Sequence, residues 1–344
     1  MAQLNTIGVD LAKSVIQVSV VTPRGKELVN KALTRKKFAE FLAVQKPSRV
    51  AFEACATSHF WARTAREHGH EVRLLPAISV KPFRQGHKTD QNDALAVAEA
   101  ATRPHIKEAP LKSVDQQALQ AVQRSRELLI RNRTALSNRI RGLLLEFGIA
   151  IPKGFSHLHA QVPEILEDAD NGVPHMFRST LHLMHQRLIE IKQDIDVLTT
   201  QIVQLVNANE SCKRLLDLEG VGPISAVLLY ATLGTGEAFH SGREFSAYLG
   251  LTPKQYSSGG KTKLIGISRH VANKRLRAVL IQGARAYINR VNDPQTPKDK
   301  WLVAMVERAG YGKASVALAN KNVRTAWAML TRGEAYDRLQ GAAG

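Results

Sequence analysis

A short apolar run that leads straight into an acidic residue, Thr6-Ile7-Gly8-Val9-Asp10, is the feature that most constrains this chain. The residues after it, 14–22, alternate apolar and polar side chains as a second, half-buried strand does. A carboxylate at the end of a buried strand is costly unless its charge is compensated, and a divalent metal is the usual partner. For this stretch alone, a structural aspartate at a strand end is the favoured interpretation.

The first hundred residues continue in an α/β pattern. We expect strands at 4–10, 15–22, 27–33, 49–53 and 71–75, and helices at 35–44 and 58–68. The turn Pro23-Arg24-Gly25-Lys26 predicts that the second and third strands pair as a hairpin. The order β-β-β-α-β-α-β is that of an RNase H-like (RuvC-like) fold, which we assign to residues 1–112 by fold-level analogy.

Two long amphipathic segments, 115–147 and 177–206, follow. Their apolar residues recur at helical spacing, which predicts an antiparallel helix hairpin or a coiled-coil projection across 113–210. Such apolar stripes are primarily packing signals, in a core or at an oligomer seam.

The remaining residues, 211–344, are predicted to form a mainly α-helical domain. Near its start, Gly220-Val221-Gly222-Pro223 lies between two helical segments, the pattern of a helix-hairpin-helix. In that motif Gly220 and Gly222 let the backbone approach a phosphate near a helix start. An ordinary tight connection between helices is the alternative.

Three further acidic residues join Asp10 as candidate metal ligands. Glu53 ends a predicted strand as Asp10 does, and Asp90 and Asp93 share one face at the start of a helix. Two acids there alone would favour the helix dipole. Four acids that converge would repel one another strongly, whereas two Mg²⁺ ions about 4 Å apart would make them a clamp for phosphodiester chemistry.

A second constellation lies in a segment without acidic residues, between Glu244 and Asp293. A charge run is usually a solvated face, but one of this length without a compensating acid favours a polyanion surface. Within it, Ser257-Ser258-Gly259-Gly260 is expected to form a loop in which a hydroxyl could reach a phosphorus atom. From spacing alone, a simple flexible loop is the favoured interpretation of these four residues. The candidate nucleic-acid contacts are Lys254, Lys261, Lys263, Arg269, Lys274, Arg275 and Arg277.

Composition narrows the class of protein. A formal charge of +18 over 344 residues favours nucleic acid as partner. Two cysteines exclude a disulfide framework, no apolar run reaches membrane-spanning length, and Walker and dinucleotide-binding glycine loops are absent. Two histidine pairs are not accompanied by the cysteines or carboxylates that would complete a zinc site, so we interpret them as solvated. They are His157/His159, expected in a loop, and His182/His185, expected on a helix.

With both constellations in place, the chain resembles the DEDD-type transposases of insertion sequence family 110, bacterial recombinases guided by a bridge RNA. The resemblance rests on motifs in the family's order over nearly the whole chain: Gly8-Val9-Asp10-Leu11-Ala12-Lys13, Phe52-Glu53-Ala54, Lys88-Thr89-Asp90-Gln91-Asn92-Asp93-Ala94, Gly220-Val221-Gly222-Pro223, and Gly250-Leu251-Thr252-Pro253 through Ser258-Gly259. One departure is Glu53-Ala54-Cys55-Ala56-Thr57, where many members have a glycine soon after the glutamate, so the turn there is undetermined.

The resemblance implies that Asp10, Glu53, Asp90 and Asp93 form a metal-binding tetrad, with Mg²⁺ as cofactor, in a RuvC-like domain. It further implies that Ser258, more than Ser257, is a nucleophile that forms a covalent phosphoserine with DNA. The implied partners are donor and target DNA, a noncoding bridge RNA that carries the sequence specificity, and other copies of the chain in a dimer or tetramer. A bacterial cytoplasmic location, at the nucleoid when DNA is bound, is expected, since the N-terminus lacks a signal-peptide layout.

Two other functions remain open from the residues. One is a RuvC-like structure-specific nuclease that hydrolyses phosphodiesters with two metals and forms no protein–DNA adduct. The other is a non-catalytic nucleic-acid scaffold, which the four acids disfavour because a phosphate binder would avoid them.

Overall fold

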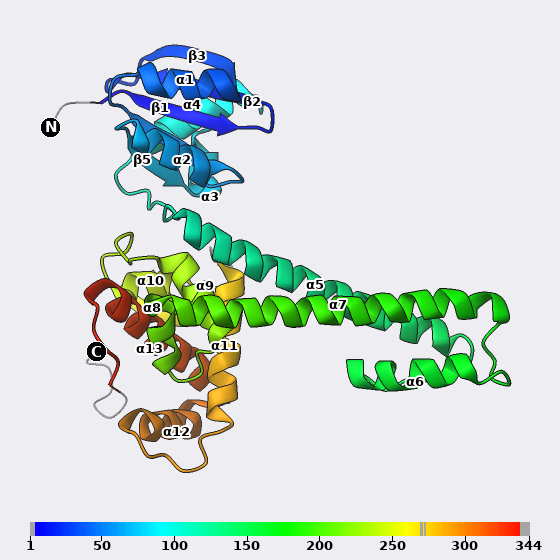
Figure 1. Cartoon of the computed structure of the whole chain (residues 1–344). Coiled ribbons are helices and arrows are strands. Elements are labelled where there is room, and N and C mark those ends of the chain that lie inside the picture. Colours follow the sequence, from blue (N-terminus) through cyan, green and yellow to red (C-terminus); the bar gives the residue numbers. More distant parts are fainter. Residues whose placement is uncertain (1–3, 269–270, 272, 338–344) are drawn as a thin grey trace. The chain divides into compact units, whose positions relative to one another are not determined.

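The computed structural model describes residues 4–268, 271 and 273–337 (Figure 1). The chain forms two compact units, Met1–Ser113 and Val114–Gly344. The expected separate helical region, 113–210, is grouped with the C-terminal residues in the second unit, because its long helices pack against α8 (Glu210–Arg214) and α9 (Pro223–Leu233).

A five-stranded sheet in the order β3-β2-β1-β4-β5 forms the centre of the first unit. Its strands are β1 (Thr6–Leu11), β2 (Val15–Val21), β3 (Glu27–Thr34), β4 (Arg49–Glu53) and β5 (Glu71–Leu75). The first three strands are antiparallel neighbours, whereas β4 pairs parallel to β1 and β5 parallel to β4. This mixed sheet confirms the α/β prediction and is consistent with an RNase H-like domain.

The two faces of this sheet are covered differently, because side chains alternate along each strand. Ile7 and Val9 of β1 join a core with α1 (Arg35–Val44) and α2 (Ser58–Glu67). On the opposite face α4 (Asp90–Ala101) crosses β1 and β2, together with the short α3 (Ala77–Val80) and the 3-10 turn η1 (Lys81–Phe83).

Gly8 allows α4 to lie directly on β1. A Cβ atom at Gly8 would overlap the backbone of Ala94 and lie 2.7 Å from the Cβ of Ala98, so no larger residue fits. The buried face of α4 is built from alanines and Val97. Small side chains on both elements therefore fix the distance between the start of α4 and the end of β1.

Thr57, in the turn between β4 and α2, has a φ of +70°. A β-branched residue in this left-handed region is strained, and a glycine is not. The turn that the sequence left undetermined thus has a threonine in the left-handed conformation.

We expect Thr57→Gly to raise the free energy of unfolding by about 1 kcal/mol, measured by urea denaturation. Ala56→Gly, one residue earlier, is the matched control and should not stabilise; an equal gain there would contradict the strain argument.

In the second unit α5 (Val114–Leu145) and α7 (His175–Ala208) run antiparallel (Figure 1). Leu119 of α5 packs with Val206 of α7 at one end, and Leu144 packs with Leu181 at the other. The expected antiparallel hairpin is confirmed, while its coiled-coil geometry stays a prediction. The connection is not the simple loop that the sequence suggested, because α6 (Phe155–Glu167) lies within it and carries His157 and His159.

The C-terminal residues form a helical core built on α9, α11 and α13. The elements are α8 (Glu210–Arg214), η2 (Leu215–Asp217), α9 (Pro223–Leu233), α10 (Gly242–Tyr248), α11 (Lys274–Ile288), α12 (Pro297–Ala309) and α13 (Tyr311–Arg332). No helix among the described residues has an apolar stretch long enough to span a bilayer.

One expectation for this unit is wrong. The predicted serine loop is a β-hairpin of β6 (Pro253–Ser258) and β7 (Lys261–Ile267). Gly259 and Gly260 both have positive φ, at +55° and +76°. Two such residues make the tight turn that joins twisted antiparallel strands, so the paired glycines close a hairpin instead of loosening a loop.

Candidate active site and nucleic-acid interface

Asp10 and Glu53 lie side by side at the carboxyl ends of two parallel strands. The β1–β4 register pairs Val9 with Phe52, which makes Asp10 and Glu53 the next residues along. Gly8 faces α4, and Ala51 packs in the cluster formed with α4, so alternation places both carboxylates on the α4 side of the sheet.

Asp90 and Asp93 occupy the first turn of α4. The helix begins where it does because the Thr89 hydroxyl accepts a hydrogen bond from the Asn92 N–H at 3.3 Å, an N-terminal cap. Since α4 packs on β1 at Gly8, this turn lies near the end of β1.

The carboxylates are close enough to affect one another. Burial raises the pKa of Asp10 above its ordinary value, and the charges of Asp93, Asp90 and Glu53 raise it further, against an opposing effect of Lys88. The Arg84 guanidinium lies 3.4 Å from Asp93 and compensates one charge. Among the described residues, no three acidic, histidine or cysteine side chains already form a group arranged to hold a metal.

The β6–β7 hairpin has two chemically different faces. The register pairs Ser258 with Lys261, Tyr256 with Lys263, and Lys254 with Ile265. Paired residues point to the same side of a ladder, and positions two apart share a face. One side, which we call the lysine face, therefore consists of Lys254, Tyr256, Ser258, Lys261, Lys263 and Ile265.

The two serines are separated by this alternation. Ser258 lies on the lysine face beside Lys261. Ser257 lies on the opposite face, where its hydroxyl accepts a hydrogen bond from the Gln255 amide at 3.0 Å. Cations that could stabilise an alkoxide or a phosphate thus surround Ser258 and not Ser257.

The other predicted cationic contacts have different surroundings. Lys274 at the start of α11 is exposed, whereas Arg275 forms an ion pair with Glu127 at 2.5 Å. Arg277 is half-buried and donates to the carbonyl of Ser268 near the base of the hairpin. Arg269 lies outside the described residues. The hairpin lysines and Lys274 are the cations best placed to meet a polyanion.

The two glycines of the turn before α9 also differ. Gly220 packs directly against Gly283 of α11, where a Cβ on either residue would overlap the other's backbone. This close approach accounts for Gly220 without a phosphate. Gly222 caps α9, and a Cβ there would meet nothing within 4 Å, so packing of the kind seen at Gly220 does not account for this glycine.

Comparison with known proteins decides the family. Residues 7–149 match a family model described as Transposase, and residues 212–300 match one described as Transposase IS116/IS110/IS902 family. A probable family 20 transposase of Pseudomonas aeruginosa is 40% identical, covering 97% of this chain and 98% of that protein. The transposase for insertion sequence element IS1111A of Coxiella burnetii is 37% identical, over 98% and 92%. The chain belongs to the IS110 family of transposases.

A more distant relative is named for the inversion of a gene. The pilin gene-inverting protein of Moraxella lacunata is 22% identical, over 96% of this chain and 97% of that protein. The IS110-family assignment agrees with the resemblance drawn from the motifs, and it makes the chain an enzyme that cuts and rejoins DNA.

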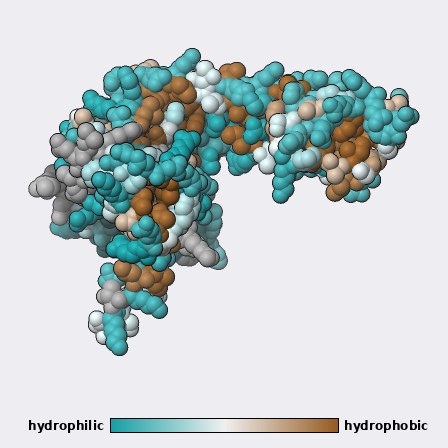
Figure 2. Space-filling view, turned by 90° about the horizontal axis from the view of Figure 1, so that it is seen from below, coloured by the Kyte–Doolittle hydropathy of each residue, from teal (hydrophilic) through white to brown (hydrophobic). Residues whose placement is uncertain are grey.

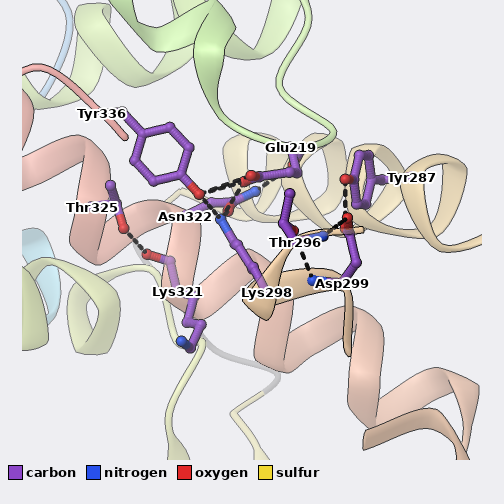
Figure 3. Close-up of polar contacts among 9 residues, drawn as sticks. All are labelled: Glu219, Tyr287, Thr296, Lys298, Asp299, Lys321, Asn322, Thr325 and Tyr336. Carbon is purple, nitrogen blue, oxygen red and sulfur yellow. Dashed lines mark hydrogen bonds and ion pairs between the residues drawn. The ribbon is translucent and has the colours of Figure 1, made fainter. Parts of the chain in front are cut away.

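A buried ion pair that the motifs did not indicate holds the glycine turn of this transposase in place (Figure 3). Glu219, directly before Gly220, and Lys298 of α12 form a salt bridge with side chains only 1% and 4% exposed. Tyr336 donates to Glu219 at 2.8 Å, and the Asn322 side-chain amide donates to the Glu219 carbonyl at 2.6 Å. In the sequence, the only sign of this ion pair is that Glu219 stands within an apolar segment, because its partner Lys298 is 79 residues away.

Removing Lys298 should destabilise this transposase strongly. Lys298→Met leaves the Glu219 carboxylate buried without its cation, which costs about 3 kcal/mol of unfolding free energy. Glu219→Gln combined with Lys298→Met removes both charges and should recover part of that loss, measured by denaturant unfolding. A double variant no more stable than the single one would contradict the charge argument.

One histidine prediction is also wrong. His185 of α7 is buried, its Nε2 has no hydrogen-bond partner among the described residues, and its ring lies 5.6 Å from that of His159. Burial lowers the pKa of His185, and the neighbouring His159 and His182 lower it further. His185 is therefore a neutral histidine in the core and not a solvated one.

Proposed function

We propose that this transposase is an RNA-guided DNA recombinase that uses a metal-bound acidic tetrad and Ser258 as nucleophile. The observation that carries the proposal is the placement of Ser258 on the lysine face, opposite Ser257, in a chain that also brings four carboxylates to one edge of its sheet. A serine surrounded by cations and a tetrad that requires cations are both suited to phosphodiester chemistry.

Asp10, Glu53, Asp90 and Asp93 would hold the divalent metal. Their donor atoms are all carboxylate oxygens, which suit Mg²⁺, and the raised pKa of Asp10 indicates charge repulsion that a cation would relieve. Because the four do not yet form a closed ligand group, their side chains must draw together on binding, and Asp93 must share or leave Arg84. Bound Mg²⁺ would stabilise negative charge on the phosphate oxygens.

The serine step conserves the energy of the phosphodiester. Ser258 Oγ forms a bond to phosphorus, the bond from phosphorus to one sugar oxygen breaks, and that oxygen takes up a proton while the serine loses one to solvent. Lys261 and Lys263 lie on the same hairpin face and would offset charge on the phosphate. A second sugar hydroxyl can then attack the phosphoserine and rejoin the strands without an external energy source.

The rival function is a nuclease that hydrolyses DNA with the tetrad alone. Gene inversion, named for the Moraxella lacunata relative, requires that cut strands be rejoined, which favours a recombinase. The test incubates the transposase, its copurified RNA and labelled donor and target DNA, followed by a denaturing gel. A covalent protein–DNA band supports the serine mechanism, and free ends without such a band support the nuclease.

A noncoding guide RNA is the second partner in the proposal. The charge of +18, and lysines on an exposed hairpin instead of in a base-reading helix, suit a protein that contacts backbones while RNA–DNA pairing reads sequence. Sequencing the RNA that copurifies with the protein tests this directly: one enriched species with segments complementary to donor and target would support it.

Assembly into a dimer or tetramer is also proposed. Large apolar side chains are exposed along the two long helices, including Leu128 and Leu145 of α5 and Leu183 and Val197 of α7. Figure 2 shows hydrophobic residues reaching an otherwise mainly hydrophilic surface in separate stretches. Contact between copies of the chain would bury these side chains, and the mass in solution, measured by light scattering, tests the assembly.

A further inference from the structure

Tyr256 is a large aromatic side chain that the proposed chemistry does not use. It is 68% exposed on the lysine face of the hairpin. Its cross-strand partner is Lys263, and Lys254 and Ser258 lie two positions before and after it on the same strand. An exposed aromatic ring flanked by lysines and next to the proposed nucleophile combines a stacking face with charges that suit a polyanion.

The spacing along β6 relates the ring to the serine. Two residues of a strand span about 7 Å, on the order of the length of one nucleotide in an extended nucleic-acid strand. Successive positions on the lysine face therefore present a cation, an aromatic ring and a hydroxyl at intervals that match the repeat of such a strand. Lys254 and Lys263 are placed to meet phosphates while the ring meets a base.

Charge decides between possible occupants of this face. A second copy of the hairpin would bring three lysines against three lysines, which repel. A nucleic-acid strand supplies phosphates that complement them. Aromatic rings beside basic side chains are a common means of binding single-stranded nucleic acid, because the ring stacks on a base that is not paired with another base.

We propose that Tyr256 stacks on an unpaired base of the DNA strand, next to the phosphate that Ser258 attacks; the position of that base rests on the proposed function. The stack would hold the strand so that its phosphate lies at the Ser258 hydroxyl, which makes Tyr256 a positioning residue. Stacking tolerates any base, so it adds no sequence preference to an enzyme whose specificity comes from elsewhere.

The test uses the full-length chain carrying Ser258→Ala, so that binding is measured without chemistry. The probe is a single-stranded DNA oligonucleotide containing 2-aminopurine, whose fluorescence is quenched when an aromatic ring stacks on it. We expect Tyr256→Ala to weaken binding about tenfold and to remove most of the quenching, whereas Tyr256→Phe keeps both. Leu264→Ala is the matched control, because Leu264 is 67% exposed on the opposite face.

Several outcomes would overturn the inference. One is unchanged binding and quenching in Tyr256→Ala, and another is a loss of binding and quenching in Leu264→Ala that equals the loss in Tyr256→Ala. A third is tighter and equally quenched binding of an RNA oligonucleotide of the same sequence, which would assign the face to RNA. The proposed function fails separately: if the Ser258→Ala change left DNA cleavage intact, the stacking result would still stand as a statement about strand binding.

Discussion

Replacing Ser258 by alanine should lower the rate of DNA strand cleavage by about 10³-fold or more and abolish the covalent protein–DNA band. The hydroxyl oxygen is the atom that bonds to phosphorus in the proposed step, so alanine leaves no nucleophile at this position. The measurement is a single-turnover cleavage assay with Mg²⁺ and the copurified RNA, read on denaturing gels.

Ser257→Ala is the matched control for this experiment. It removes the same hydroxyl one residue earlier, on the face where Ser257 accepts a hydrogen bond from Gln255. We expect activity within a fewfold of the unaltered protein, since a surface hydroxyl with a neutral partner contributes little. Loss of cleavage in Ser257→Ala with retention in Ser258→Ala would reverse the assignment, and retention in both would favour metal-dependent hydrolysis.

Asp10→Asn should also reduce cleavage by about 10³-fold, because it removes one carboxylate from the proposed metal ligands while it keeps the size of the side chain. The same change should abolish stabilisation by Mg²⁺. In the unaltered protein, Mg²⁺ that binds to the folded state should raise the melting temperature. Glu99→Gln, on the same helix but outside the tetrad, is the matched control and should keep both properties.

Without metal, Asp10→Asn should be more stable than the unaltered protein at neutral pH. The folded pKa of Asp10 is raised, chiefly by burial and then by Asp93, Asp90 and Glu53, so its charged form disfavours folding. This penalty is fully present above the raised pKa and disappears as the pH falls towards 3.8, the ordinary value.

The advantage of Asp10→Asn in melting temperature should therefore shrink as the pH is lowered from 7 to 4, measured by thermal unfolding in the presence of a chelator. An advantage that stays constant or grows over this range would contradict the charge argument. Stabilisation by Mg²⁺ that survives in Asp10→Asn would show that Asp10 is no ligand.

The N-terminal elements could be predicted from sequence because their signals are local. The strand Arg49–Glu53, the helix Arg35–Val44 and the turn at Gly25 agree with the structure. Period-two alternation and turn residues act over a few positions, and the strand order then follows from common topology. The IS110-family motifs could be recognised for the same reason, since each spans no more than ten residues.

The C-terminal site was less predictable because its decisive relations are between distant residues. Ser257-Ser258-Gly259-Gly260 reads equally well as a loop, and only pairing with Lys261–Ile267 makes it a hairpin. Gly220 resembles a phosphate-contacting glycine until Gly283 of α11 is found against it. Local composition does not encode which backbone segments approach each other.

The sequence by itself determined that four acids stand at strand and helix ends, that a serine lies in a basic segment, and that the chain resembles the IS110 family. These depend on residue type and spacing along the chain. The tertiary structure decided that Gly8 lets α4 approach β1 and that Ser258 and Ser257 point to opposite faces of a hairpin. Both depend on close packing and on strand register, which arise only when segments far apart in the sequence come together.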